Sequence, residues 1–193
     1  RRFGGTGLGL AISKRIVEQM GGEDRIALAA FDETVKLVRD FTADKTEVLR
    51  DIDQASAASD PRLLDGIGAA LALPFPGRAS RKAIVVITAG IEGLNRNSVQ
   101  DVVRLARRHR VSVYTVFVHG STRGMFETIA RQTGGAAFLL RDHKPESGAR
   151  IVNALRGAYL LRISGAAAPG EQLRVNVKGR EKTFVSALPL ESR

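Results

Sequence analysis

AIVVIT, residues 83–88, and VSVYTVFV, residues 111–118, are two apolar segments separated by a helical pattern over residues 98–109. Neither segment shows a sustained alternation of apolar and polar residues, which is typical of strands that are covered on both faces. The helical pattern places valines on one side and arginines on the other, so one side is expected to pack on a sheet. A buried strand, a helix and a second buried strand in this order indicate a parallel crossover unit and therefore an α/β fold.

The same alternation of strands and helices extends in both directions along the chain. Residues 26–31 and 34–41 are expected to form a hairpin that ends in an edge strand. Helices are also predicted at residues 44–55, 61–73, 122–133 and 147–159, with a further strand at residues 136–140. Strands that alternate with helices imply a doubly wound, mostly parallel sheet of the Rossmann type.

The pattern divides the chain into three parts. Residues 1–22 contain an amphipathic helix, expected to pack as part of the main domain, because apolar side chains recur every four residues from Leu8 to Met20. Residues 23–159 are expected to form the main α/β domain. Residues 160–193 are expected to form a small antiparallel β appendage, with short strands at residues 160–163, 172–177 and 183–187.

The composition limits the classes of function. Of the 193 residues, 44% are apolar and 26% are charged, which is ordinary for a globular protein, and no apolar run has the length of a membrane span. The absence of Cys excludes disulfides and thiolate chemistry. The net charge is +10, but the basic residues are scattered and only 5% of residues are aromatic, so no specific nucleic-acid partner is expected. The chain shows neither an initiator Met nor a signal peptide, as in a fragment or a processed form.

Four segments in order carry a family resemblance over about residues 24–190. They read DRIALAAFDETVKLVRDFTADK, RKAIVVITAGIEG, VVRLARRHRVSVYTVFV and IARQTGGAAFLL, and begin at residues 24, 81, 102 and 129. Together they resemble the von Willebrand factor A domain, and the tail RGAYLLRI is similar to bacterial secreted proteins of that superfamily. The resemblance implies a doubly wound fold and a domain that binds a protein partner.

The resemblance also implies a metal site, which this sequence does not complete. Such domains hold Mg²⁺ with an Asp-x-Ser-x-Ser loop after the first strand, a Thr from a second loop and a later Asp, since this hard cation needs oxygen ligands. Here the first loop is absent, the Thr loop aligns with residues 60–63 without a suitable hydroxyl, and the late Asp aligns with Ala89. Thr88 and Glu92 are the nearby oxygen-bearing residues, so no metal is expected. Asp65 is expected to stay solvated or to cap a helix.

The first residues resemble a different family. Gly5, Thr6, Gly7, Leu8, Gly9 and Leu10, followed by AISKRIVEQMGG, are similar to the second glycine box of a histidine kinase, which contacts the ATP triphosphate. Glycines let backbone amides approach phosphates, and a helix N-terminus favours anions. The other ATP-binding motifs of that family are missing, so the segment predicts a phosphate site at most. The alternative is that residues 8–20 supply only a core helix.

The junction of the two resemblances has a structural consequence. In an A domain, the first strand lies between the strands that correspond here to residues 26–31 and 83–88. No apolar candidate for it precedes residue 8. Either these two strands pair directly, or a gap opens between them and leaves backbone groups unpaired. A chimeric or fragmentary reading frame is a further hypothesis.

The sequence therefore predicts a non-catalytic protein-interaction module that acts without a metal or other cofactor. The expected surface is the carboxyl edge of the sheet, where α/β sites gather, and comprises Thr88, Ala89, Gly90, Glu92 and His119. The competing hypothesis is ATP or phosphate binding at Gly5–Leu10. The partner and the oligomeric state stay open. The compartment stays open too, since the larger resemblance suggests export and the smaller one the cytoplasm.

Overall fold

The computed structural model describes most of the chain up to the end of its last helix. The described residues are 6–31, 34–55, 62–76, 81–90, 93–118, 123–140 and 146–157. The predicted appendage strands at residues 160–163, 172–177 and 183–187 lie outside them. None of the helices within these ranges is long and apolar enough to cross a membrane.

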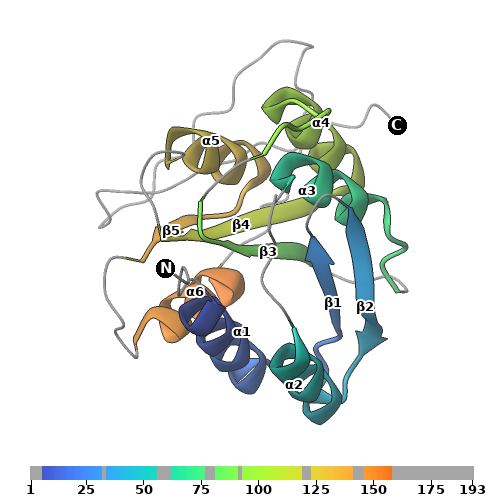
Figure 1. Cartoon of the computed structure of the whole chain (residues 1–193), viewed down its shortest axis with the longest axis vertical. Helices are drawn as coiled ribbons and strands as arrows, with labels where there is room; N and C mark the ends of the chain where they lie inside the picture. Colours follow the sequence, from blue (N-terminus) through green and yellow to red (C-terminus); the bar gives the residue numbers. More distant parts are fainter. Residues whose placement is uncertain are drawn as a thin grey trace, which may run out of the picture.

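A three-stranded parallel sheet forms the centre of the molecule (Figure 1). Its strand order is β3-β4-β5, with β3 at Lys82–Thr88, β4 at Val111–Phe117 and β5 at Ala137–Leu139. The register places Lys82 opposite Val111 and Thr88 opposite Phe117. This arrangement confirms the α/β fold with parallel crossover units.

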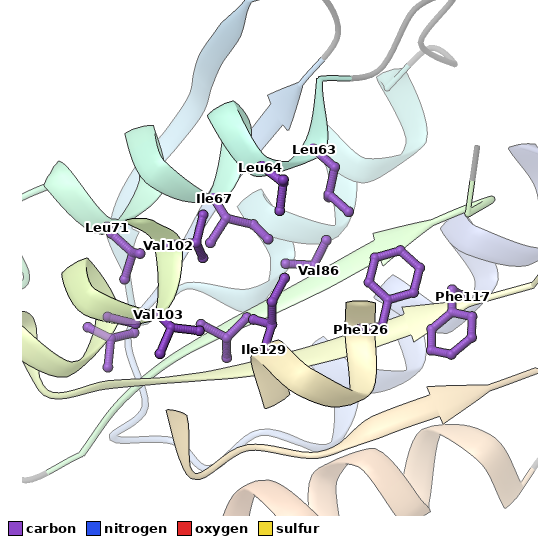
Figure 2. Close-up of a cluster of buried hydrophobic side chains, with 13 residues drawn as sticks. Leu63, Leu64, Ile67, Leu71, Val86, Val102, Val103, Phe117, Phe126 and Ile129 are labelled. Carbon is purple, nitrogen blue, oxygen red and sulfur yellow. The ribbon is translucent and has the colours of Figure 1, made fainter. Parts of the chain in front are cut away.

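Three helices cover one face of this sheet. They are α3 (Leu63–Ala72), α4 (Val99–His109) and α5 (Arg123–Thr133), and α4 and α5 connect successive parallel strands. Their apolar side chains meet those of β3 and β4 in one buried cluster, drawn in Figure 2. The labelled members point toward one another between the helices and the sheet: Leu63, Leu64, Ile67, Leu71, Val86, Val102, Val103, Phe117, Phe126 and Ile129.

The ends of α4 show why this helix starts and stops where the sequence predicts. Ser98 and Asp101 form a reciprocal capping box, in which the Ser98 side chain accepts from the Asp101 N–H and the Asp101 side chain accepts from the Ser98 N–H. At the other end, Arg110 takes a left-handed conformation with φ 56° and its N–H bonds back to the helix. The chain then enters β4 directly.

The opposite face is covered by α1 (Thr6–Gln19) and α6 (Glu146–Arg156), with α2 (Lys45–Gln54) beside α1 (Figure 1). Ile12 and Ile16 of α1 are buried against Val116 and α6, and Val17 is buried against α2. The N-terminal helix is thus part of the hydrophobic core, as its four-residue apolar repeat indicates.

The strands β1 (Ile26–Phe31) and β2 (Val35–Thr42) form the expected antiparallel hairpin, with register irregularities around Leu28. The hairpin is a separate sheet: within the described residues, no ladder joins β1 to β3. Of the two alternatives raised by the sequence, direct pairing of β1 with β3 is not found in the described part of the chain.

Candidate interaction surface at the carboxyl edge of the sheet

The carboxyl ends of β3, β4 and β5 lie along one edge because the three strands are parallel. At this edge Thr88 ends β3 and its hydroxyl accepts a hydrogen bond from the Gly90 N–H at 3.2 Å. Gly90 has φ 88°, a left-handed conformation that a side chain would strain, so the chain turns sharply here. Ala89 lies between them and is half-buried. The turn starts the loop that leads to α4.

Asp65, in the first turn of α3, holds the far end of this loop. Its carboxylate accepts the backbone N–H of Asn97 at 2.8 Å, the Asn97 side-chain amide at 2.8 Å and the backbone N–H of Arg96 at 3.1 Å. Burial opposes ionisation of this carboxyl, but the donors of Asn97 and Arg96 outweigh it and lower its pKa below the ordinary value. Asp65 is half-exposed, and beyond the solvated or helix-capping position expected from the sequence, its side chain binds the loop before α4.

Asn95 makes the reciprocal contact from the loop to the helix. Its side-chain oxygen accepts the N–H of Leu64 at 2.9 Å and that of Asp65 at 3.3 Å, while its amide donates to the Gly93 carbonyl at 3.0 Å. The helix needs this partner because its own N-cap residue, Arg62, makes no side-chain capping bond. We call the contacts of Asp65 and Asn95 the α3–loop latch.

The latch fixes a loop that carries an exposed apolar side chain. Leu94 is 89% exposed, although its neighbour Asn95 is anchored on both sides. Arg96 is also exposed, while its backbone N–H is held by Asp65. The Leu94 side chain is thus exposed to solvent, and the hydrogen bonds of Asn95 and Asp65 restrict the movement of the backbone that carries it.

The structure places three of the five predicted surface residues. Thr88, Ala89 and Gly90 lie at the carboxyl edge, whereas Glu92 and His119 fall outside the described residues. The latch residues and Leu94 were not predicted as part of the surface. The one available signal is the polar run Asn95-Arg96-Asn97 between a buried strand and a helix, which is typical of side chains that bond to backbone.

The described residues contain no group of three or more His, Cys, Asp or Glu side chains that could hold a metal ion. Among the described residues, Asp65 is the acidic side chain nearest in sequence to the predicted Thr loop at residues 60–63, and its oxygens accept hydrogen bonds from N–H donors. The Thr88 hydroxyl accepts from Gly90. The Asp65 carboxylate and the Thr88 hydroxyl are thus both hydrogen-bonded within the protein.

The glycine box has a different form from the phosphate loop that the sequence suggested. Thr6 to Leu10 are the first turn of α1, and Gly5 lies outside the described residues. A Cβ on Gly9 would lie 3.5 Å from a methyl of Ile87, so the helix approaches β3 closely at this point. The Gly9 carbonyl accepts the Ser13 hydroxyl at 2.9 Å.

The parallel sheet, its two helix layers and the loops at its carboxyl edge define the class: a Rossmann-like α/β domain. The model of the von Willebrand factor type A domain matches residues 10–150, and the chain belongs to this family. The match begins inside the segment that resembles a histidine kinase, and no comparison supports that second resemblance. A comparison with curated proteins found no match.

Solved structures share the fold at low sequence identity. An aerotolerance-related membrane protein from Bacteroides fragilis is 14% identical with a TM-score of 0.65, over 79% of this chain and 89% of that one. BatB from Bacteroides thetaiotaomicron is 16% identical with a TM-score of 0.63, over 79% and 87%. Proximal thread matrix protein 1 of the mussel byssus, with a zinc-occupied MIDAS motif, is 20% identical with a TM-score of 0.63, over 77% and 40%.

Proposed function

We propose that this chain is a non-catalytic interaction domain, adhesion-like or scaffold-like, that binds a protein partner at the carboxyl edge of its sheet without a resident metal. Domains of this family typically mediate protein–protein interaction. The observation that carries the proposal here is the exposure of Leu94 on a latched loop. Thr88, Ala89 and Gly90 continue the surface, and we assign Glu92 and His119 to it from their sequence positions.

The latch supports binding by preorganisation. A flexible loop loses conformational freedom when it is immobilised in an interface, at a cost of about 0.5–1.5 kcal/mol for each ordered side chain. Asp65 and Asn95 order the backbone around Leu94 before any partner arrives. A partner with an apolar pocket would therefore gain the burial of Leu94 with little loss of loop entropy.

The absence of a metal from the proposal follows from the donors at the edge. The carboxylate of Asp65 accepts hydrogen bonds from backbone and side-chain N–H groups, and a cation bound to this carboxylate would displace them. Ala89 offers no side-chain oxygen at the position where the family resemblance implies an Asp. We therefore expect binding to persist in a chelator.

The test compares two exposed apolar side chains on different elements, Leu94 on the loop before α4 and Leu37 on β2. A partner is first captured with the wild-type chain and identified, and its affinity is then measured for Leu94→Ser and for Leu37→Ser on β2. Leu37 is 41% exposed and serves as the matched control. We expect Leu94→Ser to weaken binding at least tenfold and Leu37→Ser to leave it unchanged, with and without EDTA. Equal binding by Leu94→Ser, or loss of binding in EDTA, contradicts the proposal.

Phosphate binding at Gly5–Leu10 is the alternative, because the first turn of α1 places the N–H groups of a helix N-terminus at this segment. It predicts that ATP at about 100 times its dissociation constant adds about 2.7 kcal/mol of stability. We expect no such shift with ATP or Mg·ATP in thermal unfolding.

A single cooperative transition in the same measurement would also argue against the hypothesis of a chimeric reading frame that cannot fold.

A further inference from the structure

The strands β1 and β3 belong to different sheets but lie between the same helices. On one face, α1 packs with Val85 and Ile87 of β3 through one cluster and with Ile26 and Leu28 of β1 through another. On the other face, a Cβ on Gly66 of α3 would lie 3.1 Å from Cβ of Phe31 on β1, and α3 also shares a cluster with Val86 of β3. Figure 1 shows the two strands between α3 and the layer of α1 and α2.

In the part of the chain that the structure describes, each of these strands has a ladder on one of its two edges. Within the described ranges, β1 pairs with β2, β3 pairs with β4, and no ladder occupies the second edge of either strand. Strand edges between covering helices carry N–H and C=O groups that need partners. Ala83, near the start of β3, is exposed, although its neighbour two residues on packs in the core. The facing edges of β1 and β3 could therefore form hydrogen bonds with one more strand.

The handedness of the crossovers indicates where the chain should go after α6. From β3 to β4 to β5 the sheet grows away from β1, with α4 and α5 on the face of α3. The next helix, α6, lies on the opposite face and packs on α1. Strand–helix–strand crossovers are right-handed in nearly all proteins. Because α6 lies on the opposite face from α4 and α5, a right-handed crossover through α6 requires the next parallel strand to lie on the β1 side of β5.

The end of α6 lies at the start of the gap. The carbonyl of Arg156, its last residue, accepts a hydrogen bond from Arg81 at 3.1 Å, and Arg81 directly precedes β3. The Arg156 side chain donates to the carbonyl of Gln19 at 2.7 Å, and Gln19 is the last residue of α1, shortly before β1. The chain thus leaves α6 beside the amino ends of both open edges.

We propose that the facing edges of β1 and β3 form an acceptor for one strand, supplied by residues 160–163 of this same chain and parallel to β3. These residues read LLRI and were expected from the sequence to be a strand, although of an antiparallel appendage. Helices cover both faces of the layer, so the occupant needs mainly apolar residues; Leu160, Leu161 and Ile163 meet this need, and Arg162 is the one charged member. A parallel strand here would join the two sheets into one.

The first test uses cysteine pairs in the 193-residue chain, which contains no Cys of its own. Ala83→Cys is combined with Leu160→Cys or Leu161→Cys, and Leu173→Cys replaces these in the control. Neighbouring strands are about 4.8 Å apart, within the range of a disulfide. We expect one of the first two pairs to oxidise within the monomer and the control pair to stay reduced. Disulfide-linked dimers would assign the strand to a second copy and overturn the proposal, as would no disulfide in either test pair.

The second test reads the unpaired edges themselves by hydrogen exchange. Proline at position 161 removes an N–H donor and breaks a strand, and Leu173→Pro is the matched control in the same tail. We expect Leu161→Pro to speed exchange at least tenfold in β1 and β3 while β4 stays protected, and Leu173→Pro to change neither. Unchanged protection of β3 in Leu161→Pro contradicts the proposal. Protection of β4 shows in the same experiment that the domain has stayed folded.

Discussion

The Asp65 carboxylate accepts the backbone N–H of Asn97 at 2.8 Å, across 32 residues of sequence. This bond joins the first turn of α3 to the residue that precedes the Ser98 cap of α4. It also closes the loop on which Leu94 is exposed. Two helices and the candidate interaction surface therefore depend on one carboxylate.

Replacement of this carboxylate by an amide should weaken the domain measurably. Asp65→Asn places an NH₂ group where the native side chain only accepts, so the N–H groups of Arg96 and Asn97 lose part of their pairing. We expect a loss of about 1–3 kcal/mol in the free energy of unfolding, measured by urea denaturation. Asp53→Asn is the control, since Asp53 is mostly exposed and pairs only with Lys14 among the described contacts. An equal effect of the two substitutions would mean that the latch adds no stability.

The lowered pKa of Asp65 gives this effect a pH dependence. Its pKa in the folded state lies below the ordinary value of 3.8, so the folded state favours the ionised carboxylate. The resulting stability is present above the unfolded pKa and is lost as the pH falls through the folded one. The difference in unfolding free energy between wild type and Asp65→Asn should therefore be full at pH 7 and shrink below about pH 4. A difference that stays constant down to pH 2.5 contradicts this assignment.

Thr115 on β4 offers a substitution that should stabilise the protein. Its side chain is fully buried, and its hydroxyl has no hydrogen-bond partner in the described part of the chain. Thr115→Val replaces an unsatisfied hydroxyl by a methyl of similar shape, so we expect a gain of about 1 kcal/mol in unfolding free energy.

Thr133 provides the opposite case with the same substitution. Its hydroxyl donates to the Ile129 carbonyl at 2.8 Å and accepts the Val113 N–H at 3.0 Å, which ties the end of α5 to β4. Thr133→Val should therefore destabilise the domain by about 1–3 kcal/mol in the same urea measurement. If both variants shift stability in one direction, the hydrogen bonding assigned to these two threonines is wrong.

Arg39 should matter for the way β2 packs on α2. Its guanidinium forms a two-point contact with Asp51, at 2.6 and 3.2 Å, and a further bond with Glu47 at 3.2 Å. The hydrogen bond from Arg39 lowers the pKa of Asp51. Lys cannot reproduce this fork. The thermal midpoint of unfolding should fall in Arg39→Lys. It should not fall in the control Lys36→Arg, which lies on the same strand. Equal midpoints in the two variants would mean that the Arg39 contact does not stabilise the domain.

The central crossover was predictable from sequence because its determinants are local. The apolar runs of β3 and β4, the apolar side of α4 and the Ser98-to-Asp101 cap all lie within a few residues of one another. The α3–loop latch was not predictable for the opposite reason. Its members are 30 to 32 residues apart, and local rules look for a helix cap next to the helix, where Arg62 supplies none.

The sequence predicted that the interaction surface lies at the carboxyl edge of the sheet, but it did not predict Leu94 as part of that surface. Parallel strands place Thr88 and its neighbours at one edge, and topology alone locates them. The exposure of Leu94 has no sequence signal, because an isolated Leu beside polar residues is equally compatible with burial. Only the contacts of Asn95 and Asp65 show that the loop holds this side chain outward.

The contact between α6 and α1 decides whether α1 is a structural part of the domain. A Cβ on Gly148 of α6 would lie 2.8 Å from Cβ of Arg15 on α1, so the two helices touch at backbone distance there. Gly148→Ala should push them apart and reduce the unfolding free energy by about 1–3 kcal/mol. Gly124→Ala is the matched control: that position also lies in a helix, α5, but nothing is within 4 Å of the added methyl. The control should gain up to about 1 kcal/mol in unfolding free energy from helix propensity.

If Gly148→Ala instead behaves like Gly124→Ala, then α1 docks loosely and residues 1–22 are an appendage to the family domain. Destabilisation confined to Gly148→Ala would make the N-terminal helix a required part of the fold, whatever the origin of its glycine-rich start.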